Sequence, residues 1–327
     1  MTTKERLFGL LDENRGRFIS GEEIASSLLV SRAAVWKGIQ SLRRDGYEIE
    51  AVRNKGYMMP ERTDILSASG VLKYLEDISG RYGLFIDVQK SVTSTNTVLK
   101  EKAQQGGTEG CVLIAANQTA GKGRVGRSFY SPENTGVYLS ILLRPEAYDA
   151  VRASRFTTMA AVAACKAVEE LTDDRALIKW VNDVYLHDRK IAGILTEASI
   201  DLESGYIEYA VLGIGFNVYE PVNGFPDEIR NRAGSILKTQ GRDAKNKLAA
   251  AFIRYFMACY HDDQSAQDYI HEYRERSFVV GHEIEVIEGE KRTPAYALSV
   301  DDECRLIVRY ANGMTEALSA GEVSICI

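Results

Sequence analysis

The clearest chemical feature of this sequence is a short loop that alternates glycines with cations. Residues 121–127 read Gly-Lys-Gly-Arg-Val-Gly-Arg and follow an apolar stretch that predicts a strand. Glycines let a ligand approach the backbone closely, and arginine forks match the geometry of phosphate oxygens. The Lys-Ser/Thr pair of a Walker A motif is missing. We expect the cations to repel one another in an empty loop and to bind a polyanion. A surface loop that contacts DNA, or nothing, is the alternative.

Three other clusters, the first made of two segments, carry polar groups that suit a ligand site. Lys179-Trp180-Val181-Asn182-Asp183 and Asp188-Arg189-Lys190-Ile191-Ala192-Gly193-Ile194 flank a predicted hairpin, whose simpler interpretation is a hairpin with charged ends. Ser94-Thr95-Asn96 open a helix after a strand and also suit simple N-capping. The stretch 212–217 has glycines inside a strand, which indicate either a close approach to the backbone or a bulge.

These segments lie in a central region, 63–275, in which predicted helices and strands alternate. Short hairpin connections favour a mixed, partly antiparallel sheet over a doubly wound one, and the fold class is α+β with several domains. The last region, 276–327, has only short strands, whose spacing fits a small β-barrel. The expected strands are 84–88, 111–117, 137–143, 177–180, 191–197, 207–214, 283–287, 295–299, 306–310 and 323–326. The expected helices here are 67–78, 95–104, 152–171 and 245–260.

Residues 1–62 predict a compact helical unit that ends in a hairpin. Ser20 and Ser31 stand at the N-cap positions of two successive helices, and Gly46 follows the second one. The next segment, 47–59, reads as strand, turn and strand, which is a wing. This order of elements is typical of a winged helix-turn-helix DNA-binding domain.

The second of these helices, 31–44, carries cations and no acidic residue, with an apolar stripe on the opposite face. Such a helix packs on one side and meets phosphates and base edges on the other. A solvated basic face on a protein-interaction domain is the alternative. One recognition helix covers one half-site, so we expect a homodimer on a two-part operator. The candidate DNA contacts are Ser31, Arg32, Ala33, Lys37 and Arg43, with Arg53 and Lys55 at the wing.

Composition limits the remaining possibilities. The chain of 327 residues suits two or three domains and can bury a large core without metal or disulfide staples. The net charge is −6, so any DNA contact must come from a local basic surface. The five cysteines form no CxxC pair, as expected of reduced core thiols. We find no signal peptide and no run of the ~18 apolar residues that a membrane span needs. We therefore expect a cytoplasmic protein that does not associate with membranes.

Taken together, the four ligand-site segments and the N-terminal unit resemble the biotin protein ligases, in the bifunctional form that is also the biotin operon repressor. The resemblance covers essentially the whole chain in the same order. GKGRVGR resembles the family's GRGRxGR loop, KWVND its KWPND, and DRKIAGIL its DRKxAGIL. SGEEIASSLLVSRAAVWKGIQSLRRDGY is similar to the repressor's helix-turn-helix. The resemblance implies a central domain like that of class II aminoacyl-tRNA synthetases and a C-terminal SH3-like barrel.

The resemblance also implies a role for each matching residue. Hydrogen bonds to the biotin head group would come from Ser94, Thr95, Asn96 and Gln118. The biotin carboxylate and the adenylate phosphate would lie along Lys122, Gly123, Arg124 and Lys190. The nucleotide would also contact Arg127, Phe129, Lys179, Asn182, Asp183 and Asn217. The residues expected to carry catalysis are Lys190, Arg124 and Arg127.

Three positions depart from the family pattern. Lys122 stands where arginine is common, so a point charge replaces a bidentate fork. Val181 replaces a proline, which we interpret as a local backbone effect. Phe129 stands where some members have a tryptophan that stacks on adenine, and a phenyl ring can also stack there. None of the three removes a group that the chemistry needs.

The implied reaction has two steps and uses biotin, ATP and Mg²⁺. The biotin carboxylate attacks the α-phosphate of ATP to give biotinoyl-5′-adenylate and pyrophosphate. A lysine of a biotin carboxyl carrier protein then attacks the mixed anhydride and releases AMP. No enzyme nucleophile is required, which agrees with the lack of a convincing Ser-His-Asp or Cys-His set among four histidines. Mg²⁺ would be held mainly by the phosphates, because no carboxylate cage is evident. Strand residues near Ile191 to Leu195 would line the biotin pocket.

The adenylate is also expected to control DNA binding. An empty cationic loop should be disordered, and the adenylate should order it and complete a dimer surface. The dimer would then repress genes of biotin synthesis or uptake. A lipoate protein ligase is one alternative, against which the winged helix and the glycine-rich loop argue. A repressor that senses biotin without catalysis is another, against which the intact Lys190, Arg124 and Arg127 argue.

Overall fold

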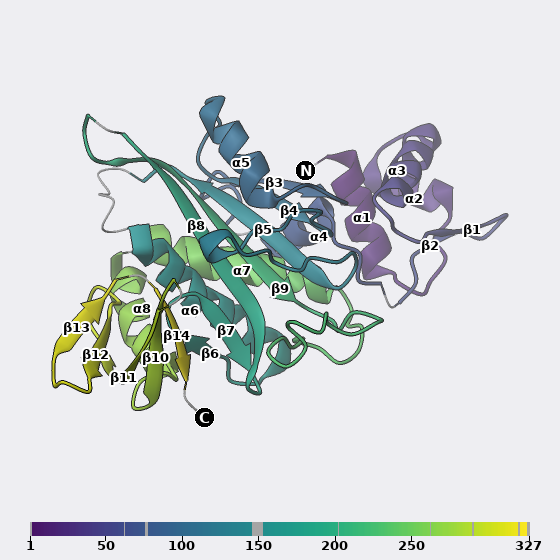
Figure 1. Cartoon of the computed structure of the whole chain (residues 1–327). Coiled ribbons are helices and arrows are strands. Elements are labelled where there is room, and N and C mark those ends of the chain that lie inside the picture. Colours follow the sequence, from purple (N-terminus) through teal and green to yellow (C-terminus); the bar gives the residue numbers. More distant parts are fainter. Residues whose placement is uncertain are drawn as a thin grey trace.

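The computed structural model describes residues 2–61, 63–75, 78–145, 153–201, 203–261, 263–289, 291–319 and 321–325. A helical N-terminal unit, a central sheet covered by helices and a small C-terminal sheet follow one another along the chain (Figure 1). The predicted α+β class is confirmed. Arg152, the expected first residue of a helix, and Cys326, at the end of the expected last strand, lie outside the described residues.

The N-terminal unit is a helix-turn-helix followed by a two-stranded wing. The hydroxyl group of Ser20 accepts a hydrogen bond of 3.1 Å from the backbone N–H of Glu23, and that of Ser31 accepts one of 3.1 Å from Ala34. Both expected caps are therefore confirmed. Gly38 allows close packing of the third helix on the first, since a Cβ there would lie 2.5 Å from the Leu7 side chain. The elements are α1 (Thr3–Glu13), α2 (Gly21–Leu28), α3 (Arg32–Arg44), β1 (Glu50–Val52) and β2 (Gly56–Met58).

The central unit is built on a seven-stranded sheet with the order β3-β4-β5-β9-β8-β7-β6. Within the described strands of this sheet, only β3 and β4 run parallel, so the expected mixed sheet is confirmed. The strand β7 was not among those expected. The strands are β3 (Phe85–Gln89), β4 (Cys111–Ala115), β5 (Gly136–Leu143), β6 (Leu177–Lys179), β7 (Asp183–Leu186), β8 (Arg189–Ile200) and β9 (Ile207–Asn217).

Alternate residues of the central strands face two different helical layers. On β4, Val112 and Ile114 pack in the main core with residues of α6 and α7, whereas Leu113 packs with Leu99 of α5 on the other face. This alternation follows from the two-residue period of a strand. The helices are α4 (Ala68–Lys73), α5 (Thr95–Gln104), α6 (Ala153–Thr172), α7 (Ala244–His261) and α8 (Asp263–Arg276).

The helix expected over 67–78 is shorter than predicted. It ends at Lys73, because the N–H groups of Tyr74 and Leu75 bond to carbonyl groups three residues back rather than four. The other three helices expected in the central unit match α5, α6 and α7 to within one residue at each described end.

The C-terminal unit is a five-stranded antiparallel sheet with the order β13-β12-β11-β10-β14. Its inner face buries apolar side chains such as Ile284, Val286 and Val308. The strand β13 was not predicted, because three of its four residues are exposed and its sequence lacks an apolar alternation. The strands are β10 (Glu283–Glu288), β11 (Lys291–Val300), β12 (Leu306–Tyr310), β13 (Thr315–Leu318) and β14 (Glu322–Ile325).

Specific polar contacts join the three units. Arg15 of the winged helix donates to the carboxylate of Asp243, which precedes α7, over 2.6 Å, and both side chains are buried. Tyr47 and Ser67 share a buried hydrogen bond of 2.6 Å between their hydroxyl groups. The indole N–H of Trp180 donates to the backbone carbonyl of Cys304 in the C-terminal unit over 2.9 Å.

Four of the five cysteines lie in described regions, and all four are buried free thiols: Cys111, Cys165, Cys259 and Cys304. Burial raises the pKa of Cys165 to about 12, so this thiol remains protonated at neutral pH. Within the described helices, none combines the length and apolar character that crossing a bilayer requires.

Candidate functional site

The glycine-rich loop folds back on itself as a short hairpin before β5. Lys122 bridges to Ser128, and the backbone N–H of Gly123 donates to the carbonyl of Arg127 over 2.7 Å. The tip, η1 (Arg124–Gly126), places Val125 and Gly126 at φ values of 53° and 72°. The loop is held in this conformation by its own backbone hydrogen bonds.

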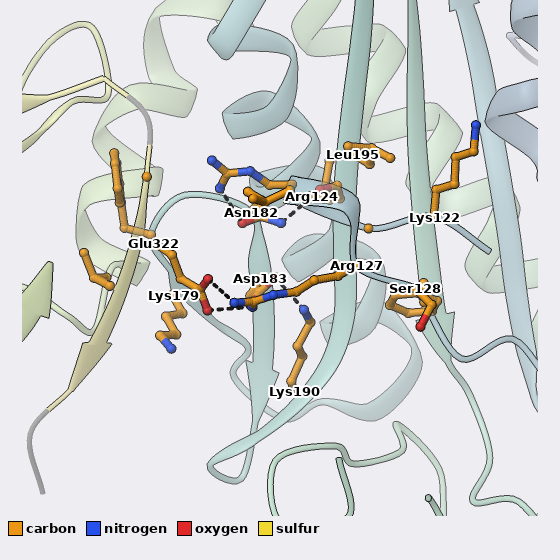
Figure 2. Close-up of a pocket in the computed structure, with 18 residues that line it drawn as sticks. Lys122, Arg124, Arg127, Ser128, Lys179, Asn182, Asp183, Lys190, Leu195 and Glu322 are labelled. Atoms are coloured by element: carbon orange, nitrogen blue, oxygen red, sulfur yellow. Dashed lines mark hydrogen bonds and ion pairs between the residues drawn. The ribbon is translucent and has the colours of Figure 1, made fainter. Parts of the chain in front are cut away.

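Two of the three cations of this loop have partners in the described structure. Arg124 donates to the side-chain oxygen of Asn182 over 2.9 Å. Arg127 forms an ion pair with Glu322 of β14, with distances of 2.6 and 2.7 Å between nitrogen and oxygen. Figure 2 shows Lys122 extending away from this pair. The expected mutual repulsion of the cations is therefore reduced, because Lys122 extends away from the two arginines and both arginines have oxygen partners.

The ion pair between the loop and the C-terminal sheet shifts both partners toward their charged forms. Burial disfavours ionisation of Glu322, but the hydrogen bond and charge of Arg127 outweigh it, so the pKa of this carboxyl lies below its ordinary value. The hydrogen bond from Arg127 to Glu322 raises the pKa of the guanidinium in turn. The Arg127 side chain remains 61% exposed, so an incoming anion can reach it.

Lys190 and Asp183 face each other across the hairpin of β7 and β8. The Lys190 ammonium lies 2.7 Å from the Asp183 carboxylate. Gly193, opposite Asp183 in the register, leaves space for this contact, because a Cβ there would lie 3.2 Å from the Lys190 ammonium. Two hydrogen bonds fix the backbone of Lys190. Its N–H donates to the backbone carbonyl of Arg232 over 2.7 Å, and its carbonyl accepts from the backbone N–H of Gly234 over 2.9 Å.

Asn182 is held at a fixed position at the corner between β6 and β7. Its side-chain N–H donates to the carbonyl of Ile194 over 3.0 Å, while its oxygen accepts from Arg124. The buried hydroxyl of Tyr273 donates to the carbonyl of Val181 over 3.1 Å, and the Trp180–Val181 peptide is cis. The corner that carries Asn182 and Asp183 is thus supported by α8.

These cations surround one cavity, shown in Figure 2. Lys179 lies on its wall, and burial lowers the pKa of its ammonium, while the charge of Asp183 opposes part of this shift. The cavity is lined by Lys122, Gly123, Arg124, Val125, Arg127, Ser128, Phe129, Lys179, Trp180, Asn182, Asp183, Lys190, Gly193, Ile194, Leu195, Gly321, Glu322 and Val323.

A smaller polar pocket lies next to this cavity, at the start of α5. Gln118 accepts the backbone N–H of Thr95 over 2.9 Å and donates to the hydroxyl of Ser131 over 2.9 Å. Ser94 stands at the N-cap position but makes no capping hydrogen bond with its side chain, so simple capping does not explain it. Leu195 and Gly193 of β8 and three residues of β9 complete the wall, whereas Ile191 is buried in the core.

Asn96 lies at the base of the polar pocket, and its hydrogen bonds are already made. Its amide nitrogen donates to the carbonyl of Leu195 and to Glu197, over 3.2 and 2.9 Å. Its oxygen accepts from Ser140 over 2.6 Å. Gly213 lies directly below, since a Cβ there would approach the Asn96 oxygen to 2.0 Å. This explains the glycine inside the strand without a bulge.

Phe129 lies where the polar pocket meets the cationic cavity. Both are lined by Lys122, Phe129, Gly193 and Leu195. The Phe129 ring covers the backbone of β8 and β9, so that a Cβ at Gly215 would lie 2.4 Å from it and one at Gly193 3.2 Å. The polar pocket and the cationic cavity therefore adjoin at the Phe129 ring, which lies between them on the backbone of β8 and β9.

Asn217, the remaining candidate from the sequence, lies behind Lys190. Its side-chain nitrogen lies 3.5 Å from the backbone carbonyl of Lys190, and its backbone carbonyl accepts from the N–H of Ile236 over 2.9 Å. It is not among the residues that line the cavity or the polar pocket. Sequence analysis missed Glu322 as a site residue, since no sequence signal relates it to Arg127, 195 positions away.

The candidate DNA-binding residues lie on the winged helix. Arg32, Ala33 and Lys37 are exposed on α3, as are Arg53 and Lys55 at the wing, and Ser31 caps α3. Arg43 instead donates to the carbonyl of Ile49 over 3.1 Å, which ties the helix to the wing. Trp36 is 56% exposed on the same helix. Sequence analysis missed it, although an exposed tryptophan on this face is an obvious candidate for an apolar contact with a base.

Comparisons with known proteins agree with this geometry. Residues 88–217 match the model of the biotin/lipoate A/B protein ligase family, and residues 3–58 match that of an HTH domain. The bifunctional ligase/repressor BirA of Bacillus subtilis is 35% identical over 82% of this chain and 80% of its own length. The BirA of Bacillus spizizenii is 32% identical over 98% of both chains. A biotin protein ligase from Aquifex aeolicus, solved with biotin and ATP, superposes with a TM-score of 0.60 at 25% identity, covering 74% of this chain and 98% of that one. This chain therefore belongs to the biotin protein ligase family, among the bifunctional ligase/repressor proteins.

Proposed function

We propose that this protein is an ATP-dependent biotin protein ligase that also acts as a biotin-responsive transcriptional repressor. One observation carries the ligase assignment: a polar pocket adjoins, at Phe129 and Leu195, a cavity lined by Lys190, Arg124 and Arg127. Biotin has the same sequence of groups, with a polar head, an apolar middle and a carboxylate. The cationic end supplies the charge that brings the carboxylate and the ATP phosphates together.

In the first step, the biotin carboxylate oxygen attacks the α-phosphorus of ATP, and the bond to pyrophosphate breaks. Lys190 and Arg124 bind the carboxylate and the α-phosphate, and Arg127 binds the departing phosphates. Catalysis is positional and electrostatic, since the cations face the charge that develops on the phosphate. When the phosphates bind, Arg127 must leave its ion pair with Glu322, and Lys190 must leave its ion pair with Asp183. Both cations then contact phosphate oxygens instead.

Mg²⁺ would neutralise phosphate charge in this step. Asp183 is a carboxylate of the cavity that can contribute to its binding. In the described parts of the chain no group of three or more His, Cys, Asp or Glu side chains is arranged to hold a metal ion. The phosphates would therefore supply most of the ligands.

In the polar pocket, Ser94, Thr95 and Gln118 bind the ureido head of biotin, and Gly123 and Lys122 lie along its tail. Asn96 contributes by positioning, because its amide hydrogens are bonded to Leu195 and Glu197. Phe129, Lys179, Asn182 and Asn217 serve the nucleotide. We propose that Phe129 moves off the glycines of β8 and β9 when biotin enters, and then stacks on the adenine.

In the second step, the ε-amine of a carrier-protein lysine attacks the acyl carbon of biotinoyl-5′-adenylate. AMP leaves with the bonding electrons, and the amine proton passes to solvent. We propose biotin carboxyl carrier domains as the acceptors and the cytoplasm as the place of reaction. In this scheme residues 1–62 bind DNA, residues 63–275 form a catalytic domain like that of class II aminoacyl-tRNA synthetases, and residues 276–327 form an SH3-like barrel.

The repressor function rests on the winged helix and requires a dimer. We propose that Ser31, Arg32, Ala33, Lys37, Arg43, Arg53 and Lys55 provide the operator contacts. The strand β8 pairs with β7 from Arg189 as far as Gly193. The rest of the strand, Ile194–Ile200, has no described strand partner on that side. This edge lies next to the glycine-rich loop and supports a homodimer that forms when the adenylate binds.

Two assays test this function. Mixing the protein with biotin and ATP should release pyrophosphate, and a biotin carboxyl carrier domain should then become biotinylated, whereas lipoate should not be transferred. Biotin plus ATP should also increase the sedimentation coefficient of the protein and its affinity for operator DNA. Lack of pyrophosphate release would support a non-catalytic biotin sensor, and transfer of lipoate in place of biotin would support a lipoate ligase.

A further inference from the structure

A second cleft lies between the winged helix and the central sheet, apart from the ligand cavity. Its walls come from the end of α3, the segment that leads into α4, the ends of β3 and β4, and the first turn of α7. None of its lining residues is shared with the cationic cavity or with the polar pocket. Neither adenylation nor operator binding, as proposed above, uses this cleft.

Lys245, on the first turn of α7, lines this cleft although it is only 4% exposed. Its backbone N–H donates to the carboxylate of Asp64 over 2.9 Å, and the other oxygen of that carboxylate accepts from Tyr219. The Lys245 ammonium itself makes no hydrogen bond or ion pair with any residue that the structure describes. The Lys245 ammonium is not among the fully enclosed unpaired atoms, so solvent reaches it from the cleft although the residue is largely buried. A ligand in the cleft that supplies oxygen atoms would therefore bind this poorly solvated ammonium in place of water.

Burial lowers the pKa of Lys245, and the nearby charge of Asp64 opposes only part of this shift. The desolvated ammonium is therefore incompletely compensated by the protein. A bound anion would restore the charged form of the lysine, since an opposite charge at short range favours ionisation.

Other charged groups of the cleft define which ligand fits. Arg44 from α3 and Lys90 after β3 line it without an ion pair in the described structure, whereas Lys4 is already paired with Asp45 at 2.6 Å. The carboxylates of Asp87 and Glu133 also line the cleft. Free cations exclude a metal ion, and these carboxylates disfavour a large polyanion, so the charge pattern fits a small anion.

We propose that this cleft is a second anion site, in which Lys245 binds a small free oxyanion, a phosphate or a carboxylate, between the winged helix and the catalytic domain. The ammonium donates to the anion from the catalytic domain, and Arg44 donates from the recognition helix. Because its walls belong to both units, the anion stabilises their docking. A phosphate of operator DNA does not reach Lys245, which is buried between the units.

Phosphate binding to the full-length protein tests this site. Calorimetric titration with inorganic phosphate, at an ionic strength held constant with sodium chloride, should show binding that weakens about tenfold in Lys245→Met, because a charge-assisted hydrogen bond is lost. Lys247→Met is the matched control, since Lys247 is exposed on the same helix and should leave binding unchanged. A parallel titration with acetate shows whether a carboxylate is also accepted.

The catalytic cavity also attracts phosphate, and Lys190→Ala separates the two sites. Phosphate binding should persist in Lys190→Ala if it occurs at Lys245. Thermal unfolding gives a second measurement: Lys245→Met should be at least as stable as the parent in chloride, and phosphate should stabilise the parent more than this variant. If Lys245→Met folds poorly, Lys245→Gln serves in its place. Full phosphate binding in the Lys245 variants, or its loss in Lys190→Ala, would overturn the proposal, whether or not the protein proves to be a ligase.

Discussion

Arg127 on the glycine-rich loop and Glu322 on β14 form an ion pair across two structural units, with distances of 2.6 and 2.7 Å between nitrogen and oxygen. In the proposed mechanism, a phosphate oxygen of ATP would take the position of this carboxylate on the guanidinium. The C-terminal sheet contributes Gly321, Glu322 and Val323 to the lining of the cavity. We therefore propose that Glu322 competes with the nucleotide for Arg127.

Replacing this competing carboxylate should strengthen nucleotide binding. Glu322→Gln keeps the size of the side chain but removes its charge, and the KM for ATP should fall by up to about fivefold, because a half-exposed ion pair contributes at most about 1 kcal/mol. Steady-state pyrophosphate release at varied ATP concentration measures this change. Glu283→Gln, at an exposed position on the same sheet, should leave the KM unchanged. An increase in the KM of Glu322→Gln would show that the pair organises the loop instead of competing with ATP.

Lys190 should contribute most of the electrostatic stabilisation of adenylation. Lys190→Ala should slow pyrophosphate release by at least about 100-fold, or about 3 kcal/mol, as expected for removal of one well-placed donor. Single-turnover formation of biotinoyl-5′-adenylate measures this effect apart from product release. Lys238→Ala, at an exposed position, is the control. Near-normal turnover in Lys190→Ala would mean that another cation of the cavity performs this role.

Gly213 should be essential for the shape of the polar pocket. Gly213→Ala places a Cβ about 2.0 Å from the Asn96 oxygen, so Asn96 must move and lose its contacts with Ser140 and Leu195. We expect a loss of about 1–3 kcal/mol in stability, typical of overpacking, together with weaker biotin binding. Chemical denaturation and biotin titration measure the two effects. Gly80→Ala, where a Cβ meets no atom within 4 Å, should change neither, and unchanged biotin affinity in Gly213→Ala would separate Asn96 from the biotin site.

Arg32 should act in DNA binding only. Arg32→Ala should weaken operator binding and reduce its dependence on salt concentration by about one released ion, while carrier biotinylation stays normal. Fluorescence anisotropy at several salt concentrations measures both quantities. Arg43→Ala provides a contrast, because Arg43 bonds to the carbonyl of Ile49 and its loss should also destabilise the winged helix. A drop in ligase activity in Arg32→Ala would show that the two functions share this residue.

The sequence by itself determined the local elements and the types of group in the site. Ser31 was predicted as a cap because serine accepts a backbone hydrogen bond at that position, and it does so here. The expected helix over 95–104 matches α5, since its apolar spacing lies within one segment. The glycine-rich loop was predicted to bind an anion from its composition, and the structure places its residues on the wall of a cavity.

Only the tertiary structure decided which distant groups meet. Glu322 contacts Arg127 from 195 residues away, and Asn96 bonds to Leu195 and Glu197 of β8, and no local pattern relates these positions. The fold also gave the loop oxygen partners for two of its cations, whereas the sequence predicted only their repulsion. Lys245 appeared in the sequence as an ordinary start of a helix, and only the fold buried it at a cleft that residues of α3, β3 and α7 line. Burial and long-range electrostatics are properties of the packed chain, so they could not be predicted from residue spacing alone.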